Sequence, residues 1–256
     1  MVAVVLMLGL LAGGGWVLFG RSSSSSARTV LDRSLAKARA VGSFHYVSVS
    51  NGTNGTFTTI GDAGRNSGKQ EITTSDSSGT ASFTVLVVGS ACYFRGDSLA
   101  MRENLGVDAA VAQAHAQQWI SLSPSDAPYA SVYAAVDTHD ALSDNITFKP
   151  QQLGSTTVGG RKLQTVSGAI EPVTGQTKPV TGTATLEVSA ASNLPVRYTE
   201  RGTSDGQSMS VSMTFSGFGE KVSESAPPGA LAFSSLGGTG GGSSSTSPPV
   251  FTSVRF

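Results

Sequence analysis

The sequence predicts an α+β protein built on an antiparallel sheet. Short extended segments, separated by Gly, Asn, Asp and Ser, recur on both sides of a helix-rich middle. One further helical pattern precedes the first set of strands. Strands and helices do not alternate one by one, as a parallel doubly wound sheet requires. These observations favour one antiparallel sheet with an inserted group of helices.

The chain begins with an apolar run, residues 1–20, which contains no ionisable side chain. As a helix, this run would be about 30 Å long, enough to cross the hydrocarbon core of a membrane. A cleavable signal peptide is the alternative, but Arg21 and five serines follow without a clear small-residue cleavage site. We therefore expect a transmembrane anchor and a single-pass protein of the cell membrane.

The orientation of this anchor is predicted less directly. Residues 21–39 contain five cations, and by the positive-inside rule they would place the main domain in the cytoplasm. However, most of these cations fall on a predicted helix of the folded domain rather than in a loop beside the membrane. We therefore favour an extracytoplasmic domain.

The first half of the folded domain is predicted from its periodicity. Residues 21–27 form a Ser-rich linker, and the domain is expected over residues 28–232. Apolar residues at helical spacing predict a helix over residues 27–41, which Gly42 ends. The strands expected next are Phe44–Ser50, Thr56–Ile60, Lys69–Thr74, Ala81–Val88 and Ala91–Arg95.

The strand over Ala81–Val88 is apolar at nearly every position, so we expect cover on both of its faces. The middle of the chain would supply that cover. Helices are predicted there over 99–105, 109–117, 126–136 and 138–144, with a short strand over 119–122. Strands are then expected over 146–149, 161–170, 183–189, 195–200 and 208–215, and a disordered Gly/Ser-rich tail over 233–256.

Composition excludes several classes of function. Lys plus Arg and Asp plus Glu are equal at 17 each, so no net positive field attracts nucleic acid. The single cysteine, Cys92, forms neither an intramolecular disulfide nor a multi-thiolate metal site, and it reads as a buried, inert thiol. The three histidines are isolated in the sequence. We expect no metal and no cofactor.

One motif has the pattern of a hydrolase nucleophile. Gly202–Gly206 (GTSDG) matches the elbow that presents a catalytic serine, here Ser204. The elbow requires a strand that turns into a helix, whereas this segment joins two predicted strands. We interpret it as a hairpin turn, and we expect no catalytic residue and no enzyme.

Several short stretches together resemble a known family, the LppX/LprG-type envelope lipoproteins of actinobacteria, which share a fold with the LolA and LolB lipoprotein carriers. The resemblance covers most of residues 43–230. The stretches are SFHY (43–46), GDAG (61–64), VLVVGSACYFRGD (85–97), QWISLSPSDAPY (118–129), LPVRY (194–198) and FSGFGEKVSESAPPGA (215–230).

This resemblance implies a strongly curved antiparallel sheet, a half-barrel, with helices packed on its concave face around an apolar cavity. In the family, the cavity holds the acyl chains of lipids or lipidated molecules. The lipidated N-terminal cysteine of the family is missing here, and the apolar helix would anchor the protein instead. The implied function is carriage or presentation of a lipid.

Of the five residues expected to line this cavity, three alternate along one strand and two are expected to lie near that strand. They are Phe83, Val85, Val87, Trp119 and Phe215. Alternation alone does not decide whether this face or that of Thr84, Leu86 and Val88 points inward. The simpler alternative is that the same side chains fill a solid core. A second function also stays open, a non-catalytic membrane-tethered module that binds another envelope protein.

Overall fold

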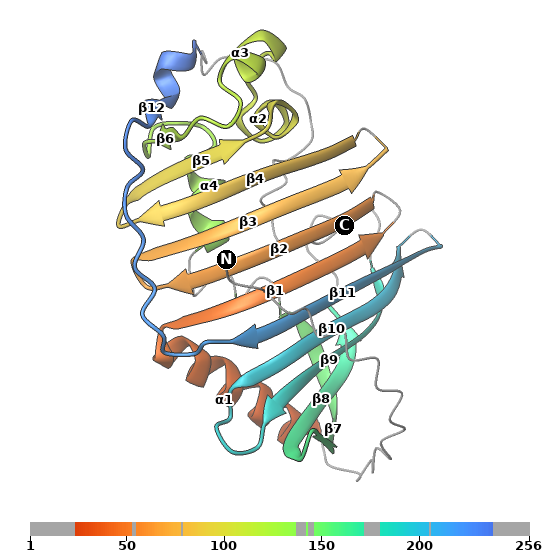
Figure 1. Cartoon of the computed structure of the whole chain (residues 1–256). Coiled ribbons are helices and arrows are strands. Elements are labelled where there is room, and N and C mark those ends of the chain that lie inside the picture. Colours follow the sequence, from red (N-terminus) through yellow and green to blue (C-terminus); the bar gives the residue numbers. More distant parts are fainter. Residues whose placement is uncertain are drawn as a thin grey trace.

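A computed structural model describes residues 24–52, 55–77, 79–136, 142, 146–171, 180–204 and 206–237. Within these residues the chain forms twelve strands and four α-helices, with one 3-10 helix (Figure 1). The helices are α1 (Ser24–Val41), α2 (Ser98–Leu105), α3 (Ala109–Ala114), α4 (Tyr129–Val136) and the 3-10 helix η1 (Phe233–Leu236). The strands are β1 (Ser43–Gly52), β2 (Gly55–Gly64), β3 (Ser67–Asp76), β4 (Gly79–Val88), β5 (Ala91–Gly96), β6 (Ile120–Leu122), β7 (Phe148–Val158), β8 (Arg161–Ile170), β9 (Thr181–Ser189), β10 (Pro195–Ser204), β11 (Gln207–Ser216) and β12 (Leu231–Ala232).

All twelve strands belong to one sheet, in the order β12-β6-β5-β4-β3-β2-β1-β11-β10-β9-β8-β7. Two antiparallel meanders, β1 to β5 and β7 to β11, meet where β1 pairs with β11. Tyr46 lies opposite Phe215 in that pairing. The two halves of the sheet are therefore joined at its centre by residues that are far apart in the sequence.

The predicted fold class was wrong. We expected a half-barrel wrapped around several helices, together with a transmembrane helix, whereas the structure is mostly one open sheet with few helices. Its edge strands, β12 and β7, stand at opposite ends and do not pair. Successive hairpins extend the sheet sideways, and the three helices described between β5 and β7 are only 6 to 8 residues long. Most of the described residues outside the turns therefore belong to the sheet.

The predicted membrane anchor is not among the described residues, which begin at Ser24. Across the part of the chain that is described, no helix combines the length and the apolar character needed to span a membrane. Apart from Leu142, the predicted helix over 138–144 lies outside the described residues, as does most of the predicted tail.

Most predicted strands are present, with bounds that extend by a few residues. The largest difference is β7, which was expected to end at Lys149 but continues to Val158. Pro150 interrupts the strand pattern in the sequence, and the register shifts just after it, between Pro150 and Gln152. An edge strand tolerates proline because one side of its backbone needs no partner. Residues 231–236 add β12 and η1, which were not predicted, and β12 runs parallel to β6.

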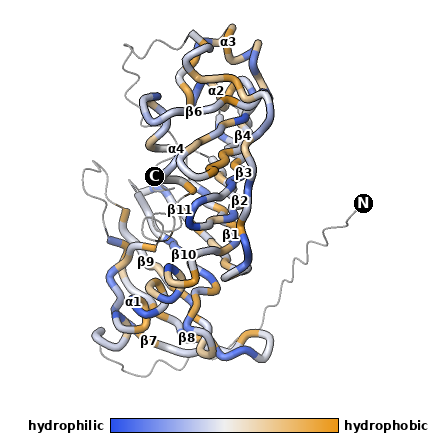
Figure 2. The backbone as a smooth tube through the Cα atoms, turned by 90° about the vertical axis from the view of Figure 1, so that its left-hand side faces the viewer, coloured by the Kyte–Doolittle hydropathy of each residue, from blue (hydrophilic) through white to orange (hydrophobic). Residues whose placement is uncertain are grey.

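The two faces of the sheet differ because side chains alternate along each strand. In β1, Phe44, Tyr46, Ser48 and Ser50 are buried, and we call the face that they share the inner face. Cross-strand pairing extends this face to the buried alternate residues of the other long strands. In Figures 1 and 2, α1 and α4 both lie on the same side of the sheet.

The buried apolar residues form two clusters. The first, the α1 cluster, gathers the apolar stripe of α1 with the inner face around β1 and β7 to β11, including Phe44, Phe148, Leu186 and Tyr198. The second, the α4 cluster, gathers α2, α3, α4 and η1 over β2 to β6. The predicted helix over 27–41 is confirmed as α1, which packs mainly on β7 and β8. The α4 helix packs on β2 to β5.

The fit of α4 on the sheet depends on a glycine. A Cβ atom built on Gly68 would lie 2.3 Å from Val136 Cγ1 and 2.7 Å from the carbonyl oxygen of Asp62. Both distances are shorter than van der Waals contact allows. Gly68 therefore lets the helix approach the strand closely.

We expect the substitution Gly68→Ala to lower the free energy of unfolding by about 1–3 kcal/mol, because the added methyl group overpacks the contact with α4. Chemical denaturation would measure this loss. Lys69→Ala on the other face of β3 is the control, and it should change stability by less than about 0.5 kcal/mol. Equal effects of the two substitutions would contradict the close approach of α4.

Candidate functional site

Three of the five predicted cavity residues lie together on the inner face. Phe83, Val85 and Val87 belong to the α4 cluster and are 4%, 0% and 6% exposed. The ring of Phe83 stacks on Phe94, with 5.4 Å between the ring centroids. Of the two faces that the sequence left open, this one therefore points inward, toward the helices.

Phe215 also lies on the inner face but in the other cluster. It packs against Phe44, with 5.9 Å between the ring centroids, and it belongs to the α1 cluster. In the sheet order, β3, β2 and β1 lie between β4 and β11. The structure thus separates Phe215 from the group around Val85.

Trp119 lies on the opposite side of the sheet. It precedes β6, where Ile120 and Leu122 are buried in the α4 cluster. Its half-buried ring lies under the Arg95 guanidinium, 4.7 Å from the ring centroid, a cation–π contact. The structure brings three of the predicted residues together and places two elsewhere; that any of them contacts a lipid stays a prediction.

Buried polar residues form a band across the inner face, where they contact aromatic residues of the α1 cluster. Gln70 donates a hydrogen bond to the hydroxyl group of Tyr46, and burial raises the pKa of that phenol above its ordinary value. The hydroxyl group of Ser50, which is 1% exposed, has no hydrogen-bond partner among the residues that the structure describes. On β10, Tyr198 donates to the buried carboxylate of Glu200. Such groups are costly to bury unless they are paired, so this band is the least apolar part of the interior.

Our reading of the sequence missed this band. The signal was present in β1, where the alternate residues Phe44, Tyr46, Ser48 and Ser50 change from aromatic to hydroxyl side chains. Alternation reveals a shared face without revealing which face is buried, so it does not distinguish these serines from ordinary strand residues.

A cavity of about 970 Å³ lies at the tip of the β7–β8 hairpin, beside the turn between β9 and β10. We call it the end cavity. The turn of the hairpin is Gly159–Gly160, and both residues have positive φ (56° and 77°), as a tight two-residue hairpin requires. The cavity is lined by Val158, Gly159, Gly160, Arg161, Lys162, Leu163, Ser189, Ala190, Ala191 and Val196.

The lining of the end cavity combines apolar walls with positive charge. Val158 is 55% exposed, a large exposed fraction for a valine, whereas Leu163 is buried. Arg161 and Lys162 are exposed, and no acidic residue lines the cavity. The ion pairs Arg28–Asp32 and Lys69–Glu71 and the hydrogen bond between His45 and Asp62 lie elsewhere. This arrangement suits an amphiphile with an apolar tail and an anionic head.

The structure also tests two kinds of chemical site, the nucleophile elbow suggested by GTSDG and a metal site. Gly202–Ser204 form the last part of β10, and Ser204 pairs with Gln207 of β11, which confirms that this segment belongs to a hairpin between two strands. No helix follows it, so the strand-to-helix geometry of a nucleophile elbow is absent at this position. Among the described residues, no group of three or more His, Cys, Asp or Glu side chains is placed to hold a metal ion.

Comparison with known proteins assigns no family. No family model matches the chain, and no curated protein sequence matches it. Among solved structures, an uncharacterized conserved protein from Thermus thermophilus is similar over 81% of this chain and 98% of its own, with 10% identity and a TM-score of 0.40. A LolA superfamily protein from Nitrosomonas europaea is similar over 75% of this chain and 91% of its own, with 12% identity and a TM-score of 0.24. Because these TM-scores are low, the proposals below do not rest on either of these structures.

The environment of Cys92 predicts its reactivity. The side chain is fully buried, and desolvation raises the pKa of the thiol from 9.0 to about 12. Because only the thiolate is nucleophilic, we expect modification of the native protein at pH 8 to be about a thousandfold slower than after unfolding in denaturant. Ellman's reagent, used with and without denaturant, would measure both rates. Comparable rates would show that the thiol is accessible in the folded protein.

Proposed function

We propose that this protein binds the acyl chain of a lipid or lipidated molecule at the cell membrane, with its folded domain outside the cytoplasm. The apolar run over residues 1–20 supports the location, and the resemblance to envelope lipoproteins supports the class of ligand. The binding itself is attributed to the end cavity. The role that we assign is carriage or presentation, without catalysis.

The observation that carries this proposal is the lining of the end cavity. Its volume of about 970 Å³ lies at the upper end of the range of about 300–1,000 Å³ that is usual for small-molecule sites. Val158, Leu163 and Val196 supply an apolar wall, and Arg161 with Lys162 supplies positive charge. An acyl chain with an anionic head matches both parts of the lining.

The energetics explain why such a site needs no catalytic group. Each CH₂ group removed from water contributes about 0.8 kcal/mol, so a long acyl chain leaves a membrane slowly when it must pass through water. An apolar cavity removes much of that cost. Transfer between a bilayer and the cavity then proceeds between two apolar environments, and the shape and charge of the cavity select the lipid.

The inner face of β11 is the second place where a chain could lie. Met209, Val211, Met213 and Phe215 face inward there, and β11 lies between the strands on which α4 packs and those on which α1 mainly packs. Methionine side chains adapt readily to ligands of different shape. Lipid uptake by one variant in the end cavity and one variant on the inner face of β11 can therefore show which of the two locations holds the acyl chain.

We expect purified full-length protein, after removal of bound lipid, to take up a labelled long-chain fatty acid at a stoichiometry near one. Ala190→Trp should reduce this uptake at least about fivefold, because the indole ring fills the end cavity from an exposed position. Ser212→Trp, exposed on the outer face of β11, is the matched control and should bind normally. Unfolding midpoints would establish that both variants fold.

Two results would contradict this assignment. Absence of uptake by the wild-type protein would remove the lipid proposal and favour a protein-binding module. Normal uptake by Ala190→Trp, with reduced uptake by Met213→Trp, would place the chain on the inner face instead of in the end cavity.

The cations of the end cavity should control selectivity for the head group. We expect Arg161→Gln and Lys162→Gln together to weaken binding of a fatty acid about tenfold, because charge-assisted hydrogen bonds to the carboxylate are lost. Binding of the matching fatty alcohol should change less than about twofold. Fluorescence competition would measure both affinities, and equal losses for acid and alcohol would count against a charged head group at this position.

A further inference from the structure

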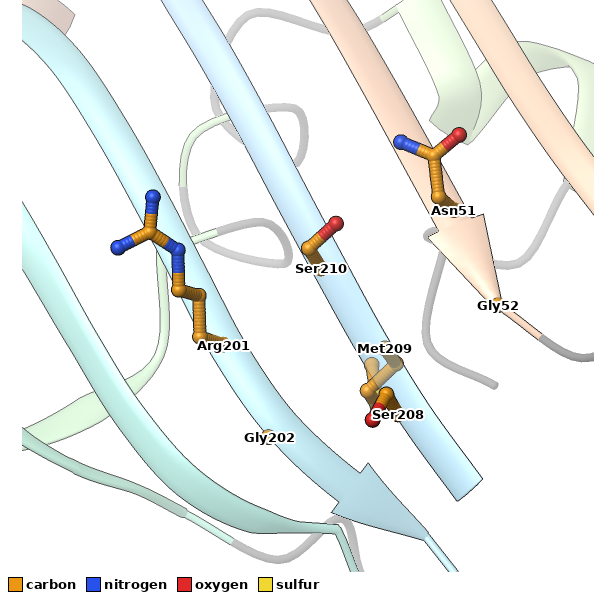
Figure 3. A pocket seen from close by; sticks show the side chains of 7 residues that line it. All are labelled: Asn51, Gly52, Arg201, Gly202, Ser208, Met209 and Ser210. Carbon is orange, nitrogen blue, oxygen red and sulfur yellow. The ribbon is translucent and has the colours of Figure 1, made fainter.

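A second cavity lies where β1 and β10 end and β11 begins, and most of its side chains belong to the outer face of the sheet, opposite the inner face (Figure 3). Its volume is about 460 Å³, and we call it the Arg201 cavity. It shares no lining residue with the end cavity. Its lining residues are Asn51, Gly52, Arg201, Gly202, Ser208, Met209 and Ser210.

Strand register places three hydrogen-bonding side chains of this cavity in one row. Ser210 of β11 lies opposite Asn51 of β1 and opposite Arg201 of β10. Neighbouring strands are about 4.8 Å apart, so the hydroxyl group lies between the amide and the guanidinium. All three belong to the face opposite the buried residues Ser50, Val211 and Glu200.

Hydroxyl groups surround Arg201 on every side of this face. Thr183 of β9 lies opposite it, and Thr199 and Thr203 precede and follow it on the same face of β10. The flanking alternate positions of β9 are Thr181 and Thr185, and those of β11 are Ser208 and Ser212. None of these neighbours carries a negative charge.

Arg197 provides a contrast within the same strand. It lies four residues before Arg201 on the same face, and its cross-strand neighbour on β9 is the acidic residue Glu187. Both arginines are exposed. The difference between them is therefore local: Arg197 faces a carboxylate, whereas Arg201 faces threonine and serine.

We propose that the Arg201 cavity binds a phosphate group. A guanidinium presents a planar fork of N–H donors that matches two oxygens of a phosphate, and the Asn51 amide and the Ser210 hydroxyl supply further donors from the same row. Gly52 and Gly202 also line the cavity, and neither adds a side chain to it. The proposal does not depend on the end cavity, because the residues and the ligand chemistry differ.

The test is a titration of full-length protein with glycerol 3-phosphate, followed by NMR at the amides of Asn51 and Ser210 and by calorimetry. We expect saturable binding, weakened about tenfold or more by Arg201→Gln and less severely by Arg201→Lys, which keeps the charge but loses the fork. Arg197→Gln is the matched control, an equal loss of charge on the same strand, and it should bind within about twofold of wild type.

A second set of measurements distinguishes a soluble ester from a lipid head group. Vesicles of phosphatidylcholine, with and without phosphatidic acid, would be sedimented with wild-type protein and with both arginine variants. Binding of phosphatidic acid that requires Arg201 while glycerol 3-phosphate fails to bind would identify a lipid-borne phosphate. Absence of binding to both probes, or equal weakening by the Arg197 and Arg201 substitutions, would overturn the proposal.

Discussion

The pairing of β1 with β11 is the interaction on which the rest of the structure depends. It joins the two meanders into one sheet, with Ser48 opposite Met213 and Ser50 opposite Val211. Because side chains alternate with a period of two, this one register determines which face every neighbouring strand presents. If β1 and β11 paired one residue out of register, the inner-face residues of one meander would lie on the same side of the sheet as the outer-face residues of the other meander.

The single sheet separates two kinds of chemistry. The inner face carries the two apolar clusters and the buried polar band, and the described helices lie over it. The outer face of β9 to β11 is rich in Ser and Thr, with scattered cations such as Arg197 and Arg201. The two cavities that we describe lie near strand ends and hairpin turns, where the backbone hydrogen bonding of the sheet stops and side chains from several strands can converge on a ligand.

Much of the strand pattern was predictable because it is local. Extended runs separated by turn residues identified β1 to β5 and β8 to β11, and the shared face of Phe83, Val85 and Val87 followed from alternation alone. The grouping of Phe215 and Trp119 with them failed for a different reason. Phe215 is several strands away in the sheet, and Trp119 falls on the opposite face, and both facts depend on pairings between distant segments. The end cavity was missed because β7 was expected to stop before the hairpin that forms it.

By itself, the amino-acid sequence determined the local features: the α1 helix, the hairpins, the place of Ser204 in a hairpin and the burial of Cys92. These follow from periodicity, turn chemistry and neighbouring residues, which act over a few positions. Only the tertiary structure decided that the sheet stays open, that α1 and α4 cover different parts of one face, and that Arg201 lies among hydroxyl groups. Those features arise from the register between strands far apart in the chain, and a local pattern carries no information about which distant strand lies next to it.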